Sequence, residues 1–304
     1  MQPLRSEQSL AMSALMLLSL IWGYNWVAMK VGLQGAGPFD FSALRFLFGA
    51  LCLLPFMLWR GDARLPAGRE WLPLTVLGLM LCANFGCVMS ALKLSGAGKT
   101  AILVYTMPFW VLIFARIALK EKLSRLQIVS VIIAAVGLAV LIEPWRLAGS
   151  MLANLLAVAA GASWGASVVL VKAIQASGRP IPTMMITFWQ MVIAVPLLAL
   201  LGWLFDPQPV VWNAGFILTL GYVSVLATGL AWILFYFALR RLPAGMAGLG
   251  TLATPVVGVA GAWRQLGERP SIVEASGMIV IVLALAMLAL SARPPRSAGT
   301  QRSN

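Results

Sequence analysis

Long apolar runs separated by short polar segments follow one another from residue 10 to residue 291. A helix needs about 20 mostly apolar residues to cross the hydrocarbon core of a bilayer. By that criterion the sequence predicts ten membrane-spanning helices, because the apolar runs are long and the connections between them are short. They are expected at residues 10–32, 40–59, 71–92, 98–118, 125–143, 150–172, 182–204, 212–238, 244–263 and 271–291. We therefore expect an all-α integral membrane protein, with residues 1–304 in a single membrane domain.

Composition supports this class and removes others. Hydrophobic residues make up 61% of the chain and charged residues 10%, whereas soluble domains carry about 25% charged residues. The chain has no histidine, which is the commonest metal ligand and proton shuttle. Its three cysteines, Cys52, Cys82 and Cys87, lie inside apolar runs and are typical of packing residues. We expect no metal, no disulfide and no cofactor.

The net charge of +13 would fit a nucleic-acid partner, but the positions of the basic residues exclude that interpretation. Nearly all of them lie in short segments between apolar runs, where they orient membrane helices. With a cytoplasmic N-terminus, 15 of the 22 lysines and arginines fall in cytoplasmic segments, and Arg45 falls within the second run. The six on the other side are Lys30, Lys93, Lys99, Arg146, Arg264 and Arg269. Both termini are therefore predicted to be cytoplasmic.

The stretch SGAGKTAILVY at residues 95–105 resembles a phosphate-binding loop, with Lys99 and Thr100 after a glycine. That motif requires another glycine six positions before the lysine, together with a preceding buried strand. Lys93 occupies the glycine position, and no strand precedes it. The stretch is better interpreted as the start of the fourth membrane helix.

The two halves of the chain repeat one another. Each half, residues 1–147 and residues 148–304, contains five of the predicted helices. At an offset of 142, Trp22, Gly23 and Lys30 match Trp164, Gly165 and Lys172. At an offset of 147, Ala97-Gly98, Pro108 and Glu121 match Ala244-Gly245, Pro255 and Glu268. Because five is odd, the second half must enter the membrane from the opposite side, and inverted repeats of this kind are typical of secondary transporters.

These residues resemble the EamA-type repeat of the drug/metabolite transporter superfamily. The Trp-Gly pair of each half's first helix, the Ala-Gly pair and proline of its fourth, and the following glutamate carry the resemblance. One departure is Lys120-Glu121 in the first repeat, where the second has the usual Gly267-Glu268. The resemblance implies a ten-helix transporter in the bacterial inner membrane, usually an exporter of metabolites or amino acids. The aromatic content is most similar to that of the aromatic amino-acid exporters. A monomer or a homodimer is compatible with it.

Polar and aromatic residues at membrane depth tend to face the interior of a helix bundle. Trp22, Asn25 and Met29 share one face of the first helix at spacings of three and four. The candidate substrate-binding residues are Trp22, Asn25, Asn84, Tyr105, Trp110, Trp164, Ser167, Gln190, Thr228, Trp232 and Tyr236. The fifth and tenth helices are almost featureless and are expected at the periphery.

Simpler roles compete with these assignments. Trp22 and Trp164 could pack without lining a path, and membrane-buried Ser and Thr often bond only their own helix carbonyls. Lys30 and Lys172 are expected to extend towards the headgroups. Arg45 lies within its span with no acid three or four residues away. It could pair structurally or bind a substrate carboxylate.

Pro108 and Pro255 lie at equivalent mid-helix positions and predict a kink or hinge, because proline removes a helical hydrogen bond. All the acids near the spans fall at or near helix ends. Proton relays through membranes normally use buried acids. We therefore expect a facilitator, or coupling that needs no buried carboxylate.

The sequence favours a secondary transporter of small, partly apolar molecules over other classes. An aromatic cavity with scattered amides and hydroxyls suits amino acids with aromatic or large apolar side chains. Lipophilic cations are an alternative cargo for aromatic walls. An intramembrane enzyme would need a nucleophile and a base at depth, and only a Ser–Lys pair remains imaginable here. A scaffold or sensor would need neither a polar path nor a repeat.

Overall fold

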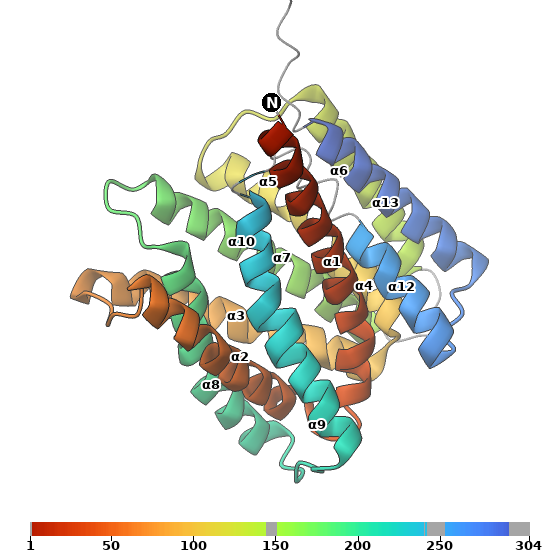
Figure 1. The fold of residues 1–304 in the computed structure, drawn as a ribbon. Coiled ribbons are helices and arrows are strands. Elements are labelled where there is room, and N and C mark those ends of the chain that lie inside the picture. Colours follow the sequence, from red (N-terminus) through yellow and green to blue (C-terminus); the bar gives the residue numbers. More distant parts are fainter. Residues whose placement is uncertain (1, 144–150, 240, 242–252, 292–304) are drawn as a thin grey trace, which may run out of the picture.

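The computed structural model describes residues 2–143, 151–239, 241 and 253–291, and this part of the chain is a bundle of helices without strands (Figure 1). The first half contains α1 (Gln2–Gly32), α2 (Pro38–Arg60), α3 (Gly68–Leu94), α4 (Ala97–Val104), α5 (Met107–Ala118) and α6 (Arg125–Ile142). The second contains α7 (Met151–Ala176), α8 (Thr183–Phe205), α9 (Ala214–Gly221), the π-helix η1 (Tyr222–Leu230), α10 (Ala231–Leu239), α12 (Ala253–Leu266) and α13 (Ile272–Ser291).

Nine helical segments within the described residues are long and apolar enough to cross a membrane. They correspond to nine of the ten predicted spans, with boundaries shifted by a few residues. The other prediction, residues 244–263, falls partly on 242–252, which lie outside the described residues. The 14-residue α12 covers the rest of it.

Two of the predicted spans are not continuous α-helices. The fourth is divided into α4 and α5 by Tyr105 and Thr106, and Pro108 lies in the first turn of α5. Proline cannot donate to the carbonyl four residues earlier, so the helical ladder stops there. The eighth span passes through η1 in its middle, where Thr228 Oγ1 donates to the carbonyl of Val223, 2.8 Å away.

The helix packing pairs elements from different halves. α1 packs against α12, η1 and α10, while α7 packs against α4, α5 and α3. α2 lies between α8 and η1, and α8 also contacts α3. If the halves are exchanged, each of these contacts maps onto another, except that between α2 and α8, which maps onto itself. α6 and α13 form a separate pair at one edge of the bundle, in agreement with the expectation for the fifth and tenth helices (Figure 1).

The Trp-Gly motif of each half lies at a close crossing with a helix of the other half. A Cβ atom on Gly23 would lie 2.5 Å from Val257 Cβ and 2.8 Å from the carbonyl oxygen of Thr254. A Cβ atom on Gly165 would lie 2.8 Å from Trp110 Cβ and 3.2 Å from the carbonyl oxygen of Met107. Val257 and Thr254 are the residues that match Trp110 and Met107 at the offset of 147. Both glycines therefore permit the same close backbone approach.

Lys30 and Lys172, which are expected to extend towards the headgroups, both have protein partners. Lys30 Nζ donates to the carbonyl oxygens of Leu92 and Ser95, at the end of α3. Lys172 Nζ lies 2.6 Å from Glu121 Oε1. A cation at a helix C-terminus satisfies carbonyls that have no partner within the helix, which explains the position of Lys30.

Candidate functional site

Arg45 is the one buried basic side chain among the described residues, with 5% of its surface exposed. α2 carries it into the space between α1, α3 and η1. Its Nε donates to Thr228 Oγ1 at 3.2 Å, and its Nη1 donates to the Met29 sulfur at 2.9 Å. Its Cζ lies 4.9 Å from the centre of the Phe85 ring, so the guanidinium also faces an aromatic surface.

No salt bridge joins Arg45 to a carboxylate of the residues that the structure describes. A guanidinium has five N–H groups and no acceptor. Burying its charge without an anion costs several kcal/mol. A thioether, a hydroxyl and a ring face compensate only partly. Among the described residues, Arg45 therefore has structural contacts with Thr228, Met29 and Phe85, but no acid partner.

Asn25 lies beside Arg45 on the α1 face predicted from its spacing. Its Nδ2 donates to the Met29 sulfur at 3.6 Å, so the amide and the guanidinium share one acceptor atom. Asn25 is 7% exposed, and its Oδ1 is buried without a hydrogen-bond partner among the described residues. A buried acceptor in this condition is energetically unfavourable until a donor reaches it. We refer to Asn25, Met29, Arg45, Phe85 and Thr228 as the arginine cluster.

Trp22 extends this cluster along α1. Its Nε1 donates to the carbonyl oxygen of Ala227 in η1 at 3.1 Å. Its ring lies edge-on to Trp232, with 5.9 Å between centroids, and 5.6 Å from Phe235. The structure thus brings together Trp22, Thr228 and Trp232, three of the predicted site residues.

Tyr105 and Trp164 form a second group, joined to α1 by Trp26. The Tyr105 ring lies edge-on to Trp26 at 6.2 Å and to Trp164 at 6.1 Å between centroids. Tyr105 occupies the break between α4 and α5, so the interrupted helix places its ring between the two indoles. Trp22 and Trp164, which are equivalent in the repeat, therefore lie in different aromatic groups.

The remaining predicted residues have local or separate roles. Asn84 Nδ2 donates to the carbonyl oxygen of Ala160 at 2.6 Å and joins α3 to α7. Ser167 Oγ donates to the Trp164 carbonyl in its own helix, which is the simpler role considered above. Trp110 Nε1 donates to Thr106 Oγ1 at 3.3 Å.

Three other predictions remain open or lie apart from these groups. Gln190 is half-buried on α8, with no hydrogen bond from its side-chain amide to another described residue. The backbone of Tyr236 belongs to α10, but its side chain lies outside the described part. Pro255 is buried in the first described turn of α12.

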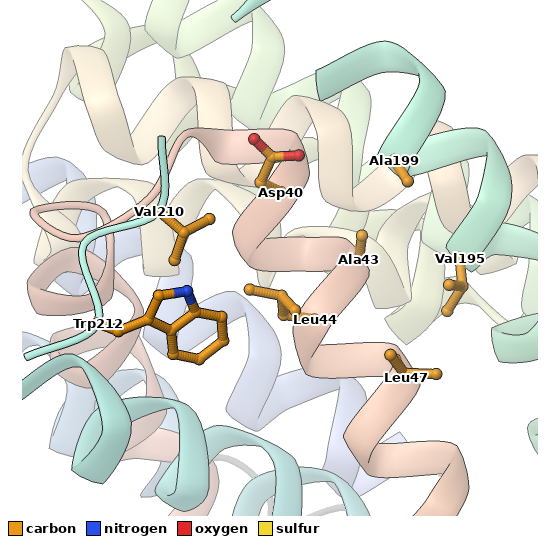
Figure 2. A pocket seen from close by; sticks show the side chains of 8 residues that line it. All are labelled: Asp40, Ala43, Leu44, Leu47, Val195, Ala199, Val210 and Trp212. Atoms are coloured by element: carbon orange, nitrogen blue, oxygen red, sulfur yellow. The ribbon is translucent and has the colours of Figure 1, made fainter. Parts of the chain in front are cut away.

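Two surface hollows lie away from the arginine cluster. The first, of about 210 Å³, is bounded by α2, α8 and residues 206–213, and Figure 2 shows its lining. Its walls are apolar apart from Asp40, which leaves few groups that could orient a polar ligand. The second, of about 250 Å³, surrounds the start of α4 beside Glu268 and the Lys99–Glu274 ion pair.

The sequence interpretation missed Trp26, Phe46 and Phe85. Trp26 lies four residues after Trp22, and this spacing could have indicated its side of α1. Phe85 matches Trp232 at the offset of 147, so the repeat could have identified it. Phe46 follows Arg45 directly, and no spacing marks it; its ring centre lies 5.9 Å from Arg45 Cζ.

The arginine cluster combines a buried cation, an unpaired amide oxygen and aromatic faces. A cation and an acceptor in one apolar space can orient a small molecule that carries both an anionic and a donor group. Within the described residues, no group of three or more Cys, Asp or Glu side chains could hold a metal ion.

Comparison with known proteins agrees with this architecture. The chain is 26% identical over 276 residues to the uncharacterized transporter YoaV of Bacillus subtilis, covering 89% of this chain and 93% of that one. It is 28% identical over 298 residues to a probable amino-acid metabolite efflux pump of Salmonella typhimurium, covering 93% and 96%. It is also 26% identical to the uncharacterized inner membrane transporter YedA of Escherichia coli, covering 91% and 90%.

A solved crystal structure with 22% sequence identity has the same fold, with a TM-score of 0.66 over 95% of this chain and 99% of that one. The EamA-like transporter family matches the sequence twice, at residues 9–142 and residues 151–290, once in each half. The chain belongs to the EamA-like transporter family.

Proposed function

We propose that this transporter exports amino acids with aromatic or large apolar side chains across the bacterial inner membrane. The observation that carries the proposal is Arg45, a buried cation without a described carboxylate partner, set against aromatic rings. The relatives named as an amino-acid metabolite efflux pump and as an inner membrane transporter support the direction and the membrane. Both termini then lie in the cytoplasm, as the positions of the basic residues predict.

Lipophilic cations are a weaker alternative for this site. Aromatic faces alone would attract them. Arg45, however, already occupies the Phe85 face with a positive charge, and like charges repel strongly in a medium of low dielectric constant. An anionic or zwitterionic molecule fits these surroundings better than a cation.

Transport would proceed by alternating access between two inverted five-helix repeats. The matched glycine crossings, Gly23 on α12 and Gly165 on α5, support a two-fold relation between the halves. The arginine cluster and the Tyr105 group would lie between halves that move relative to one another, as in other transporters of this plan. The helix break before Pro108 would act as a hinge, and Pro255 would have the same role in α12.

No buried acid lies mid-span in the described residues, since Glu70 and Glu143 are both at helix ends. The proposal therefore includes facilitated exchange without a proton relay. Concentrative transport driven by a pH gradient alone would contradict that part of it.

Purified protein in liposomes tests the proposal directly. Liposomes preloaded with unlabelled phenylalanine should exchange it for labelled phenylalanine, tryptophan or leucine, and much less for lysine, glutamate or tetraphenylphosphonium. Protein-free liposomes are the control. Exchange of tetraphenylphosphonium without exchange of any amino acid would overturn the proposal.

A further inference from the structure

We propose that Asn25, Met29 and Arg45 form a zwitterion-reading site, in which the Met29 sulfur occupies the place of the substrate carboxylate. This inference rests on the proposed function. It adds which atoms recognise the cargo, and it predicts that both the ammonium and the carboxylate are required.

Two hydrogen-bond donors converge on one atom. Arg45 Nη1, from α2, lies 2.9 Å from the Met29 sulfur, and Asn25 Nδ2, from α1, lies 3.6 Å from it. A thioether is a weak acceptor, whereas a carboxylate forms short, charge-assisted bonds with a guanidinium. A carboxylate oxygen at the sulfur position would accept both donors.

Met29 can move its sulfur away from the position between Arg45 and Asn25. Its side chain is unbranched and adaptable, so the sulfur can move aside without a change in the helix backbone. In the structure described here it is buried, with 1% of its surface exposed. The sulfur therefore partly satisfies the two donors without placing a negative charge in the cluster.

The other end of the Asn25 amide carries an acceptor oxygen. Its Oδ1 is buried and has no hydrogen-bond partner among the described residues. In an amino acid the ammonium is attached next to the carboxylate carbon, and an amide likewise presents a donor and an acceptor side by side. With the carboxylate on Nδ2 and Arg45, the ammonium would donate to Oδ1 and remove the cost of burying it unpaired.

Aromatic rings form the wall that would receive the side chain. Phe85 and Phe46 flank the guanidinium, with ring centres 4.9 and 5.9 Å from Arg45 Cζ. Trp22 contacts η1 one residue before Thr228. An aromatic or large apolar side chain would be held by these faces, while the two charges are held by α1 and α2.

The test measures binding of three related compounds by titration calorimetry: phenylalanine, 3-phenylpropionate without the ammonium, and phenylalaninamide without the carboxylate. The unmodified protein should bind phenylalanine about tenfold or more tightly than either analogue, since each lost charged hydrogen bond leaves a buried group unpaired. Asn25→Leu should bring the ratio of phenylalanine to 3-phenylpropionate affinity close to one. An unchanged ratio in a folded Asn25→Leu protein would overturn the inference.

Met29→Leu supplies a second measurement with the opposite sign. Leucine preserves the volume and removes the competing acceptor, so both carboxylates should bind about two- to tenfold more tightly. Met89→Leu is the matched control, because Met89 is fully buried in the same apolar core. Unchanged or weaker binding by Met29→Leu would overturn the role of the sulfur. If the unmodified protein binds no amino acid at all, the proposed function fails as well. If it binds phenylalanine but Asn25→Leu leaves the ratio of phenylalanine to 3-phenylpropionate affinity unchanged, only this inference fails.

Discussion

The third spans of the two halves have different helical geometry in an otherwise matched frame. α3 is an unbroken α-helix from Gly68 to Leu94, whereas its counterpart runs through α9, η1 and α10. Ala238 matches Ala91 at the offset of 147. One residue more separates Ala238 from Ala214, where α9 begins, than separates Ala91 from Gly68, where α3 begins. A π-helical turn absorbs an added residue inside a helix and often does so at a functional site.

The π-helical turn in the second half presents polar groups that have no counterpart in the α3 helix of the first half. η1 brings Thr228 against Arg45 and the Ala227 carbonyl against Trp22. When the halves are aligned on Pro55 and Pro196, Arg45 itself corresponds to Ile186, a buried apolar residue. The features that the two halves share therefore build the frame, while the candidate site lies where the repeats differ.

The largest effect is expected from disturbing the matched crossings. Gly23→Val and Gly165→Val should each greatly reduce the yield of folded protein, because the added atoms meet backbone and Cβ atoms of the facing helix. Overpacking of this kind costs about 1–3 kcal/mol or more. Size-exclusion profiles and thermal unfolding in detergent would measure it. Gly221→Val is the control, since a Cβ atom there would meet nothing within 4 Å beyond its own stretch of helix; equal loss in all three would show that the crossings are not special.

Arg45→Met should separate stability from transport. Removing a buried charge without an acid partner is expected to stabilise the fold by about 1–4 kcal/mol. Exchange of phenylalanine should fall by about tenfold or more, because the charged hydrogen bond proposed between Arg45 and the cargo is lost. Thermal unfolding and liposome flux give the two readouts. A protein that loses both stability and transport would instead assign Arg45 to the frame.

Deleting Val225 should remove the difference in helical geometry between the third spans. Val225 is 47% exposed within η1, so its removal shortens the π-helical turn without emptying the core. The helix ends should remain in register while Thr228 rotates away from Arg45. We expect a folded protein with reduced phenylalanine exchange, measured in the same liposomes. Full transport after the deletion would show that the π-helical turn is dispensable.

Thr228→Val is expected to have the smallest effect. It removes one acceptor for Arg45 and the bond to the Val223 carbonyl at nearly constant volume. A loss of about 1 kcal/mol in unfolding free energy and a few-fold slower exchange are expected. Thr187→Val is the matched control, because Thr187 is equally buried and bonds only its own helix. Identical transport by the two variants would contradict the role given to Thr228.

Periodicity was sufficient to predict most of the frame and part of the site. Trp22, Asn25 and Met29 were placed on one face of α1 from their spacing, and the structure joins that face to Arg45 through Met29. The π-helical turn was not predicted, because an added residue inside an apolar run leaves the run apolar. The partners of Trp26 and Phe85 could not be assigned either, because the sequence of an apolar helix does not indicate which residues of other helices its aromatic rings contact.

The start of α4 gives a physical reason for its likeness to a phosphate-binding loop. Glu268 Oε1 and Oε2 accept hydrogen bonds from the backbone N–H groups of Ala97 and Gly98, at 2.7 and 3.0 Å. A Cβ atom on Gly96 would lie 2.7 Å from the same carboxylate, so a glycine is needed for the close approach. The helix N-terminus does bind an anion, as such termini commonly do.

Here the anion is an intramolecular ligand from the opposite half of the chain. A tethered group competes at an effective concentration in the millimolar range or above, so dissolved phosphate would displace it poorly. The glycines of this stretch therefore allow Glu268 of the second half to bind the start of α4 in the first half.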